Sequence, residues 1–123
     1  MYRESYPSTR VKRVRAPYAS INSRGEIVLN ARVFPLLGGL NYVSLHYNDE
    51  THDIRIARPT TSGRVFNVRR FGRGGRLRVI RCRLFLKRFG IRVTQTQVFT
   101  DIRYSRDPDT VILNLRTARS ANR

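Results

Sequence analysis

Short apolar runs separated by turn-forming residues follow one another along this chain, a pattern typical of a mainly β protein. The β-branched run after Gly25 predicts a strand, and the run that ends in Gly38-Gly39 predicts about one helical turn. Two further runs enclose a polar turn and predict a hairpin that ends before Pro59. The expected elements are a strand, a short helix and two hairpin strands, over residues 26–30, 33–39, 42–47 and 54–57.

The same order of elements occurs again in the second half of the chain. A glycine turn, a strand, a short helix and a hairpin are expected there, with the regular elements over residues 76–80, 84–91, 97–104 and 110–115. The stretch from Leu77 to Phe89 also fits one longer amphipathic helix. We favour a strand followed by a helix, because the first copy has the same order with β-branched character.

The repeat is one of element order, with few identities. It indicates a single domain over residues 19–115, made of two related strand-helix-hairpin units over about 19–59 and 64–115. A basic flexible arm, residues 1–18, is expected before the domain and a basic tail, residues 116–123, after it. The predicted class is therefore mainly β with short helices.

The first copy has Arg24-Gly25 before the strand, Leu37-Gly38 at the end of the short helix, and a hairpin that ends at Arg58-Pro59. In these features it resembles the swapped-hairpin β-barrel domains of the AbrB, SpoVT and MazE type. It covers residues 19–59 well and residues 73–115 more loosely. The chain departs from the family pattern at two positions, with Asn30 where Pro is usual and Phe34 where Arg is frequent.

This resemblance implies that the two units form one pseudo-twofold β-barrel. Proteins of this type usually bind DNA as regulators or antitoxins, with basic residues at loops and strand openings facing the DNA backbone. The matching positions here are Arg24 and, in the second copy, Arg76. The two-copy layout is also similar to that of small proteins of bacteria and their phages, from which no activity carries over.

The charge of the chain supports a polyanionic partner. It has 25 Lys and Arg residues against 8 Asp and Glu, a net charge of +17 and a pI near 11.7. All the basic residues except Lys12 and Lys87 are arginines, which can hold a phosphate in a bidentate way and stack on bases. A GC-rich genome would explain that preference for Arg, though not the net charge. Nucleic acid is the expected partner, with DNA favoured over RNA.

The basic residues are concentrated between Arg69 and Arg92, where ten occur without one acidic residue. Within this stretch the glycines of residues 69–76 would let the backbone approach a phosphate chain, and Phe71 would offer a face for an unpaired base. The alternative to a binding role is a flexible hairpin loop with Phe71 packed on the core and its arginines solvated. On a strand, Arg76 and Arg78 would share one exposed face while Leu77 and Val79 enter the core, although an edge strand protected by cations has the same pattern.

The basic arm supplies further candidates before Pro17, and arms of this kind order on binding nucleic acid. The candidate nucleic-acid-binding residues are Arg10, Lys12, Arg13, Arg15, Arg24, Arg69, Arg70, Phe71, Arg73, Arg76, Arg78, Arg81, Arg83, Lys87 and Arg88.

The residues give little support to catalysis or metal binding. Cys82 lies between two arginines, but a small buried core residue is the better interpretation, and one cysteine with two histidines is too few for a four-ligand zinc site. The acidic residues fall in turns, where they cap backbone amides. We therefore expect no enzyme activity, cofactor or metal. No apolar run is long enough to cross a bilayer, and residues 1–18 lack the apolar core of a secretory signal, which predicts a cytoplasmic protein, nucleoid-associated or within an assembled particle.

The leading hypothesis is DNA binding by an AbrB-like module, as a transcription regulator or a nucleoid- or phage-associated protein. The alternative is a structural component of a ribonucleoprotein or virion that binds RNA or packaged genome, and a weaker one is an inhibitor of an acidic protein. The sequence leaves open whether two chains associate as a homodimer.

Overall fold

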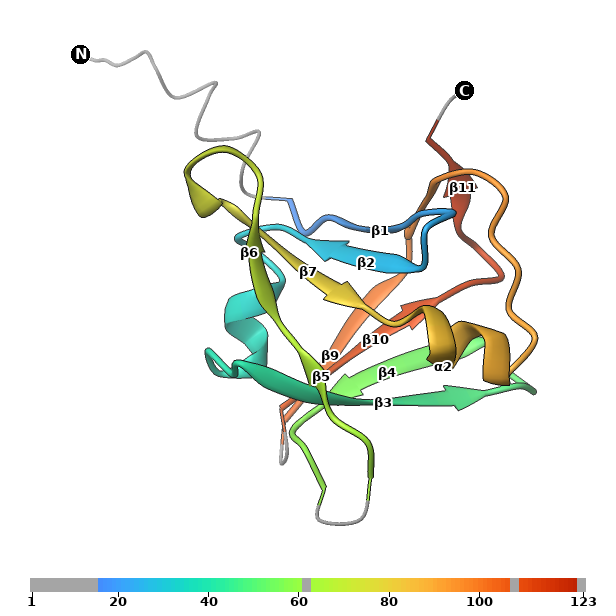
Figure 1. Ribbon diagram of the computed structural model, residues 1–123, viewed down its shortest axis with the longest axis horizontal. Helices are drawn as coiled ribbons and strands as arrows, with labels where there is room; N and C mark the ends of the chain where they lie inside the picture. The colour runs from blue at the N-terminus through green and yellow to red at the C-terminus, as the bar shows by residue number, and fades with distance from the viewer. Residues whose placement is uncertain (1–15, 61–62, 107–108, 122–123) are drawn as a thin grey trace.

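Two antiparallel sheets face each other in this protein (Figure 1). The structure, a computed structural model, describes residues 16–60, 63–106 and 109–121. The six-stranded sheet has the order β11-β8-β1-β2-β7-β6, with bounds Arg119–Ser120, Gln97–Val98, Ala19–Ile21, Glu26–Leu29, Leu77–Arg81 and Arg69–Phe71. The five-stranded sheet has the order β5-β3-β4-β10-β9, with bounds Phe66–Asn67, Tyr42–Asn48, Asp53–Ala57, Thr110–Asn114 and Ile102–Ser105. The helical elements are η1 (Phe34–Leu37), η2 (Arg73–Gly75) and α2 (Arg83–Arg88).

Most of the elements expected from the sequence are present, so the mainly β class is confirmed. The strand and helix predicted for the second half correspond to β7 and α2, and the alternative of one long helix is wrong because the chain is extended up to Arg81. The first helix is a short 3-10 helix with Pro35 in its opening turn, followed by Gly38 as its cap.

Each sheet contains strands from both halves of the chain. The order of the first sheet includes β1-β2-β7-β6. β2 of the first half pairs with β7 of the second half, and each is flanked by its own hairpin partner, β1 or β6. The second sheet has the corresponding order β3-β4-β10-β9. Each order is symmetric: exchanging the strands of the first half with those of the second gives the same order read in the opposite direction.

The segment predicted as one strand over residues 97–104 is divided between the sheets. Its first part, β8, pairs with β1, and its last part, β9, pairs with β10. Between them Phe99 is buried in the core, and its backbone N–H donates to the carbonyl of Ala19 over 2.9 Å. The chain therefore leaves one sheet and enters the other at this point.

A second segment crosses in the opposite direction. β5 pairs with β3 in the second sheet, and β6, after Val68, pairs with β7 in the first. The N–H of Val68 donates to the carbonyl of Asn41 over 2.8 Å at the crossing. Because the ladders end where the chain changes sheets, the described strands form two separate sheets, and the predicted closed barrel is not formed.

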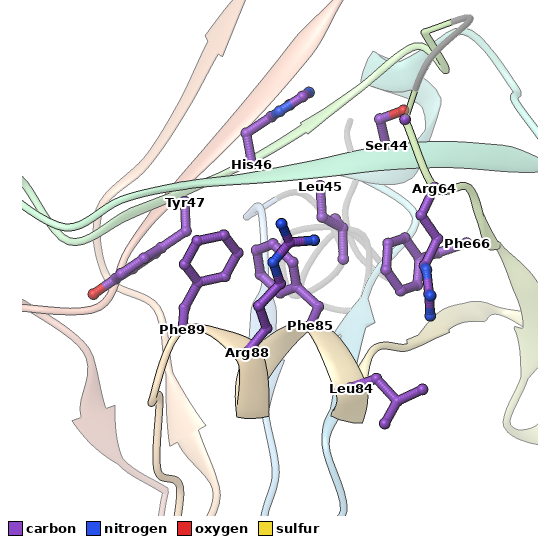
Figure 2. Close-up of a pocket in the computed structure, with 11 residues that line it drawn as sticks. Ser44, Leu45, His46, Tyr47, Arg64, Phe66, Leu84, Phe85, Arg88 and Phe89 are labelled. Carbon is purple, nitrogen blue, oxygen red and sulfur yellow. The ribbon is translucent and has the colours of Figure 1, made fainter.

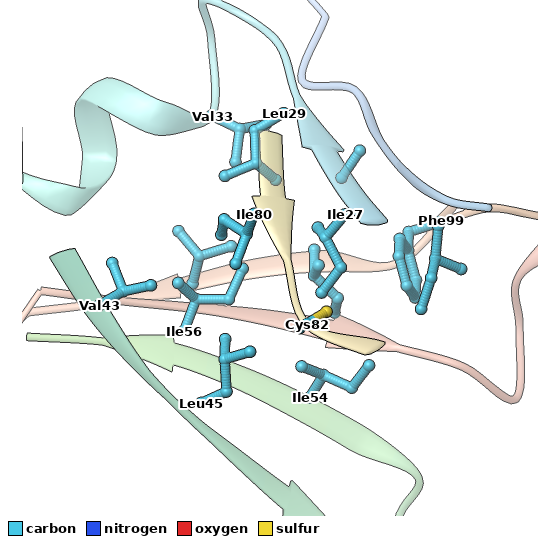
Figure 3. Close-up of a cluster of buried hydrophobic side chains, with 14 of the residues drawn as sticks. Ile27, Leu29, Val33, Val43, Leu45, Ile54, Ile56, Ile80, Cys82 and Phe99 are labelled. Carbon is cyan, nitrogen blue, oxygen red and sulfur yellow. The ribbon is translucent and has the colours of Figure 1, made fainter. Parts of the chain in front are cut away.

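The core lies between the sheets and is made almost entirely of branched aliphatic side chains (Figure 3). Ile27 of β2 lies directly opposite Ile80 of β7, and both are fully buried. The facing sheet contributes fully buried side chains of β4 and β10: Ile54, Ile56, Val111 and Leu113. Each such side chain stabilises the fold by about 1.5–3 kcal/mol relative to an exposed one, so these side chains determine which face of each strand is inside.

The segments just outside both ends of the predicted domain, residues 16–18 and 119–120, form hydrogen bonds with the rest of the fold. The side chain of Asn30, at the position where AbrB-type proteins usually have Pro, accepts a hydrogen bond from the N–H of Tyr18 (3.1 Å) and donates to the carbonyl of Ala16 (2.9 Å). Residues 16–18 of the predicted arm are thereby held, while residues 1–15 lie outside the described chain. At the other end, residues 119–120 of the predicted tail form β11 against β8, so the fold continues past residue 115.

The turn between β1 and β2 packs closely on the start of α2. Gly25 has a φ of +83°, and a Cβ atom added to it would lie 2.7 Å from the Cα of Arg83. The N–H of Cys82 donates to the carbonyl of Gly25 over 2.8 Å. The Arg24-Gly25 pair therefore needs glycine both for its conformation and for its contact with the second half of the chain.

Replacing this glycine should reduce the stability of the fold. We expect Gly25→Ala to lower the free energy of unfolding by about 2 kcal/mol or more, since a left-handed alanine costs roughly 1–2 kcal/mol and the contact with Arg83 adds to it. Gly90→Ala is the control, because Gly90 has a φ of +68° with no atom within 4 Å of an added Cβ. Urea unfolding of both variants would measure the difference, and equal losses would contradict the role of the contact.

Candidate nucleic-acid interface

The β6–β7 hairpin presents the densest group of basic side chains. We define the hairpin-tip cluster as Arg69, Arg70, Phe71, Arg73 and Arg76, all of which are exposed. The loop after β6 has three glycines with positive φ: Gly72, Gly74 and Gly75. These conformations close the hairpin, and they leave the loop backbone without side chains that would keep a phosphate away.

In the described part of the chain, the cations of the hairpin-tip cluster have no acidic partner. Among the described residues, the side chains of Arg69, Arg70, Arg73 and Arg76 make no ion pair. Phe71 is 41% exposed, so it is not packed in the core, as it would be in a hairpin loop without a binding role. The cluster therefore combines four accessible guanidinium groups with one accessible aromatic ring.

Arg78 has a different position from the one expected. It lies opposite Leu29, on the side of the sheet that carries Ile80, and its guanidinium carbon lies 4.1 Å from the centre of the Phe34 ring. Its Nη1 also donates to the carbonyl of Gly75 over 2.8 Å. The predicted exposed stripe of Arg76 and Arg78 is wrong, because the strand begins only at Leu77 and Arg78 faces inward.

These contacts give Arg78 a structural role. Its guanidinium connects the hairpin loop to η1, because it donates to the carbonyl of Gly75 in the loop and makes a cation–π contact with Phe34 of η1. Its contact with nucleic acid remains a prediction, but the residue is half-buried and its Nη1 already donates to the carbonyls of Gly75 and Leu77. Arg78 thus helps to hold in place the loop that carries the hairpin-tip cluster.

A second basic group surrounds Glu26, at the turn between β1 and β2. We define the Glu26 cluster as Arg24, Glu26, Arg81 and Arg83. The Nε atoms of Arg24 and Arg81 lie 3.3 and 3.6 Å from the two carboxylate oxygens of Glu26. Gly25 packs against Arg83, which brings the third cation to the same place. Both ion-paired arginine side chains remain more than half exposed, at 70% and 65%.

The local structure of the turn explains why Glu26 is ionised. The side-chain amide of Asn22 donates to Glu26 Oε1 over 3.0 Å, while its oxygen accepts from the N–H groups of Arg24 and Glu26. The hydrogen bond from Asn22 lowers the pKa of the Glu26 carboxyl, and the charges of Arg24 and Arg81 lower it further against the effect of partial burial. The carboxylate therefore positions two guanidinium groups without neutralising the cluster.

The remaining predicted residues of this stretch lie on α2. Lys87 and Arg88 are exposed in its last turn, where cations also interact favourably with the helix C-terminus. Arg10, Lys12, Arg13 and Arg15 lie outside the described residues, and their contribution stays a prediction.

The structure also contains an aromatic groove that the sequence did not reveal (Figure 2). It lies between β3, the segment before β5, and α2, with a volume of about 510 Å³. Its side chains include Tyr47, Phe66, Phe85 and Phe89, with Arg64 and Arg88 at its mouth. Phe85 of α2 and Phe89, the residue that follows the helix, are four residues apart in the sequence. This spacing was the only sequence signal, and it indicated a core face rather than a groove.

The described residues offer little for catalysis. Cys82 is buried, and burial, with the nearby charge of Glu26, raises the pKa of its thiol to about 12, which makes it a poor nucleophile. His46 is exposed on the outer face of β3, opposite Arg55, and Nδ1 of His52 accepts from Arg116 over 3.1 Å. Within the described ranges no three His, Cys, Asp or Glu side chains are grouped to hold a metal, and no helix is long and apolar enough to cross a membrane.

The lowered pKa of Glu26 predicts a pH dependence of stability. Because the folded-state pKa is below the unfolded value, the stabilisation is present above about pH 4.3, the ordinary pKa of glutamate, and is lost as the pH falls through the folded value. We expect Glu26→Gln to flatten the loss of stability on acidification in urea unfolding between about pH 5 and 3. Glu50→Gln, which removes an exposed carboxylate from the β3–β4 turn, is the control, and wild-type acid dependence in Glu26→Gln would contradict this account.

Comparisons with protein-family models, with curated proteins and with solved structures found no match to this chain. The AbrB-type resemblance of residues 19–59 therefore remains a prediction, and the function has to be argued from the side chains themselves.

Proposed function

We propose that this protein binds nucleic acid, with DNA as the first candidate, through phosphate contacts from the hairpin-tip cluster and the Glu26 cluster. The observation that carries the proposal is that the hairpin-tip arginines are exposed and, in the described part of the chain, without acidic partners. Their mutual repulsion costs stability, which a polyanion would offset. Their guanidinium groups can each hold a phosphate in a bidentate way.

The separation of the two clusters suits a duplex. They lie at opposite ends of the β2–β7 pair, because β2 begins at Glu26 opposite Arg81 while β7 begins at Leu77. Five residues of strand span about 15 Å. That distance is close to the width of the DNA major groove, about 12 Å, so the clusters can contact phosphates on both sides of a groove.

The strand order supports the AbrB-like form of the proposal. In that family two hairpin units associate to form the DNA-binding domain, and here a single chain supplies both halves of each sheet. The turn that contains Arg24-Gly25 and the turn that contains Arg76 occupy corresponding places, after β1 and after β6. The proposed role is therefore that of a DNA-binding regulator or nucleoid- or phage-associated protein.

A second candidate is a structural component of a ribonucleoprotein or virion. The observation that favours it is the presence of exposed cations at the five-stranded sheet as well, such as Arg103 of β9 and Arg106 just after that strand. A protein surrounded by RNA or packaged genome would use cations on more than one face. Preference for structured RNA over duplex DNA would favour this candidate.

The hairpin-tip cluster can be tested by removing three of its charges. We expect Arg70→Ala/Arg73→Ala/Arg76→Ala to weaken duplex DNA binding and to reduce the slope of log K against log salt by about 3, since each phosphate contact contributes about 0.9. Fluorescence anisotropy with a labelled duplex at several salt concentrations measures both quantities. Arg78 is excluded from the variant because its contacts with Phe34 and Gly75 would confound the result.

The matched control is Arg55→Ala/Arg58→Ala/Arg119→Ala, which removes the same charge from exposed positions outside the two clusters. Net charge alone would lower the affinity of both variants equally, which would contradict the assignment of the cluster. Absence of binding to duplex DNA, single-stranded DNA and hairpin RNA at low salt would refute the nucleic-acid function altogether.

A further inference from the structure

The aromatic groove between β3 and α2 has features of a site for an unpaired base. We propose that it binds one nucleobase of a single-stranded segment, stacked on Phe89, with the neighbouring phosphates held by Arg64 and Arg88. This inference rests on the proposed nucleic-acid function and adds a site for single strands to the two clusters that face a duplex.

The aromatic rings of the groove are held in fixed positions by one another. Phe89 packs against Phe85 with ring centres 5.1 Å apart and against Tyr47 at 5.6 Å, and Phe85 packs edge-on against Phe66 at 6.2 Å. Phe85 is buried, whereas Phe89 is 43% exposed. Phe89 is therefore held by two neighbouring rings while part of its surface stays accessible, and a stacking base requires both.

The charge at the mouth of the groove selects an anionic occupant. Arg64 comes from the segment before β5 and Arg88 from α2, so the two guanidinium groups approach from opposite sides (Figure 2). The groove is otherwise lined by Ser44, His46, Gly63 and apolar or aromatic residues, with no Asp or Glu among the lining residues described. Arg88 contacts Phe89 only loosely, with its guanidinium carbon 5.7 Å from the ring centre, so it remains available to a ligand.

A nucleotide matches this combination better than an apolar peptide does. The exposed Leu84 and Phe89 could contact either, but an apolar peptide would bring no anionic group to the two exposed arginines. A nucleotide supplies a flat ring for Phe89 and phosphates for Arg64 and Arg88 within one repeating unit. A paired base has no free face, because its neighbours in the duplex already cover it, so the site selects single strands.

The test uses a single-stranded oligonucleotide that contains one 2-aminopurine, whose fluorescence is quenched by stacking. The wild-type protein should quench the probe on binding. Phe89→Ala should lower its affinity for the single strand about fivefold or more, as expected for the loss of one base–aromatic stack, and abolish most of the quenching. Its affinity for duplex DNA should stay within about twofold of wild type, because the duplex is bound by the other clusters.

A second variant leaves the aromatic packing intact. Arg64→Ala/Arg88→Ala should weaken single-strand binding more than the equally charged control Arg55→Ala/Arg58→Ala, all four positions being exposed. Circular dichroism and thermal unfolding establish that each variant is folded.

The outcomes separate the two proposals. Duplex binding without quenching of the single strand, or equal single-strand affinity in wild type, Phe89→Ala and Arg64→Ala/Arg88→Ala, would overturn the groove proposal alone and leave the groove to an apolar peptide. No binding to any nucleic acid at low salt would overturn both.

Discussion

The pairing of β2 with β7 is the interaction on which the rest of this structure depends. It joins the two halves of the chain through the register Ile27 opposite Ile80, and both side chains are fully buried against the second sheet. The same pair carries the Glu26 cluster at one end and leads into the hairpin-tip cluster at the other. A slip of one residue would turn the aliphatic side chains outward, so one register determines both the core and the positions of the cations.

The elements that depend on local sequence were predictable, whereas those that depend on distant partners were not. Gly25, Gly38 and the polar turn before Asp53 mark their turns in the sequence, and the corresponding strands and helices are present. The short strands β5 and β11 carry no such signal, because each has two residues and pairs with a strand distant in sequence. The division of residues 97–104 between two sheets has the same cause, since Phe99 enters a core built mainly by the other strands.

For the candidate site, the sequence indicated the chemistry better than the geometry. The excess of arginine and the glycine-rich loop directed attention to residues 69–76, which are exposed in the structure. The sequence could not indicate that Arg78 faces Phe34, because that depends on the register of β7 against β2. It also could not indicate the aromatic groove, whose walls come from β3, the segment before β5 and α2, three parts of the chain that only folding brings together.

The sharing of each sheet between the two halves of the chain has a consequence for how the chain folds. Neither half contains a complete sheet: β2 and β4 of the first half complete their pairing only with β7 and β10 of the second. During synthesis the first half would emerge with two open strand edges, which are sites of unwanted association until their partners arrive. Such pairing between distant segments carries a large loop-closure cost and a high contact order. Folding is therefore expected to be slow and to occur late, after β10 has been made.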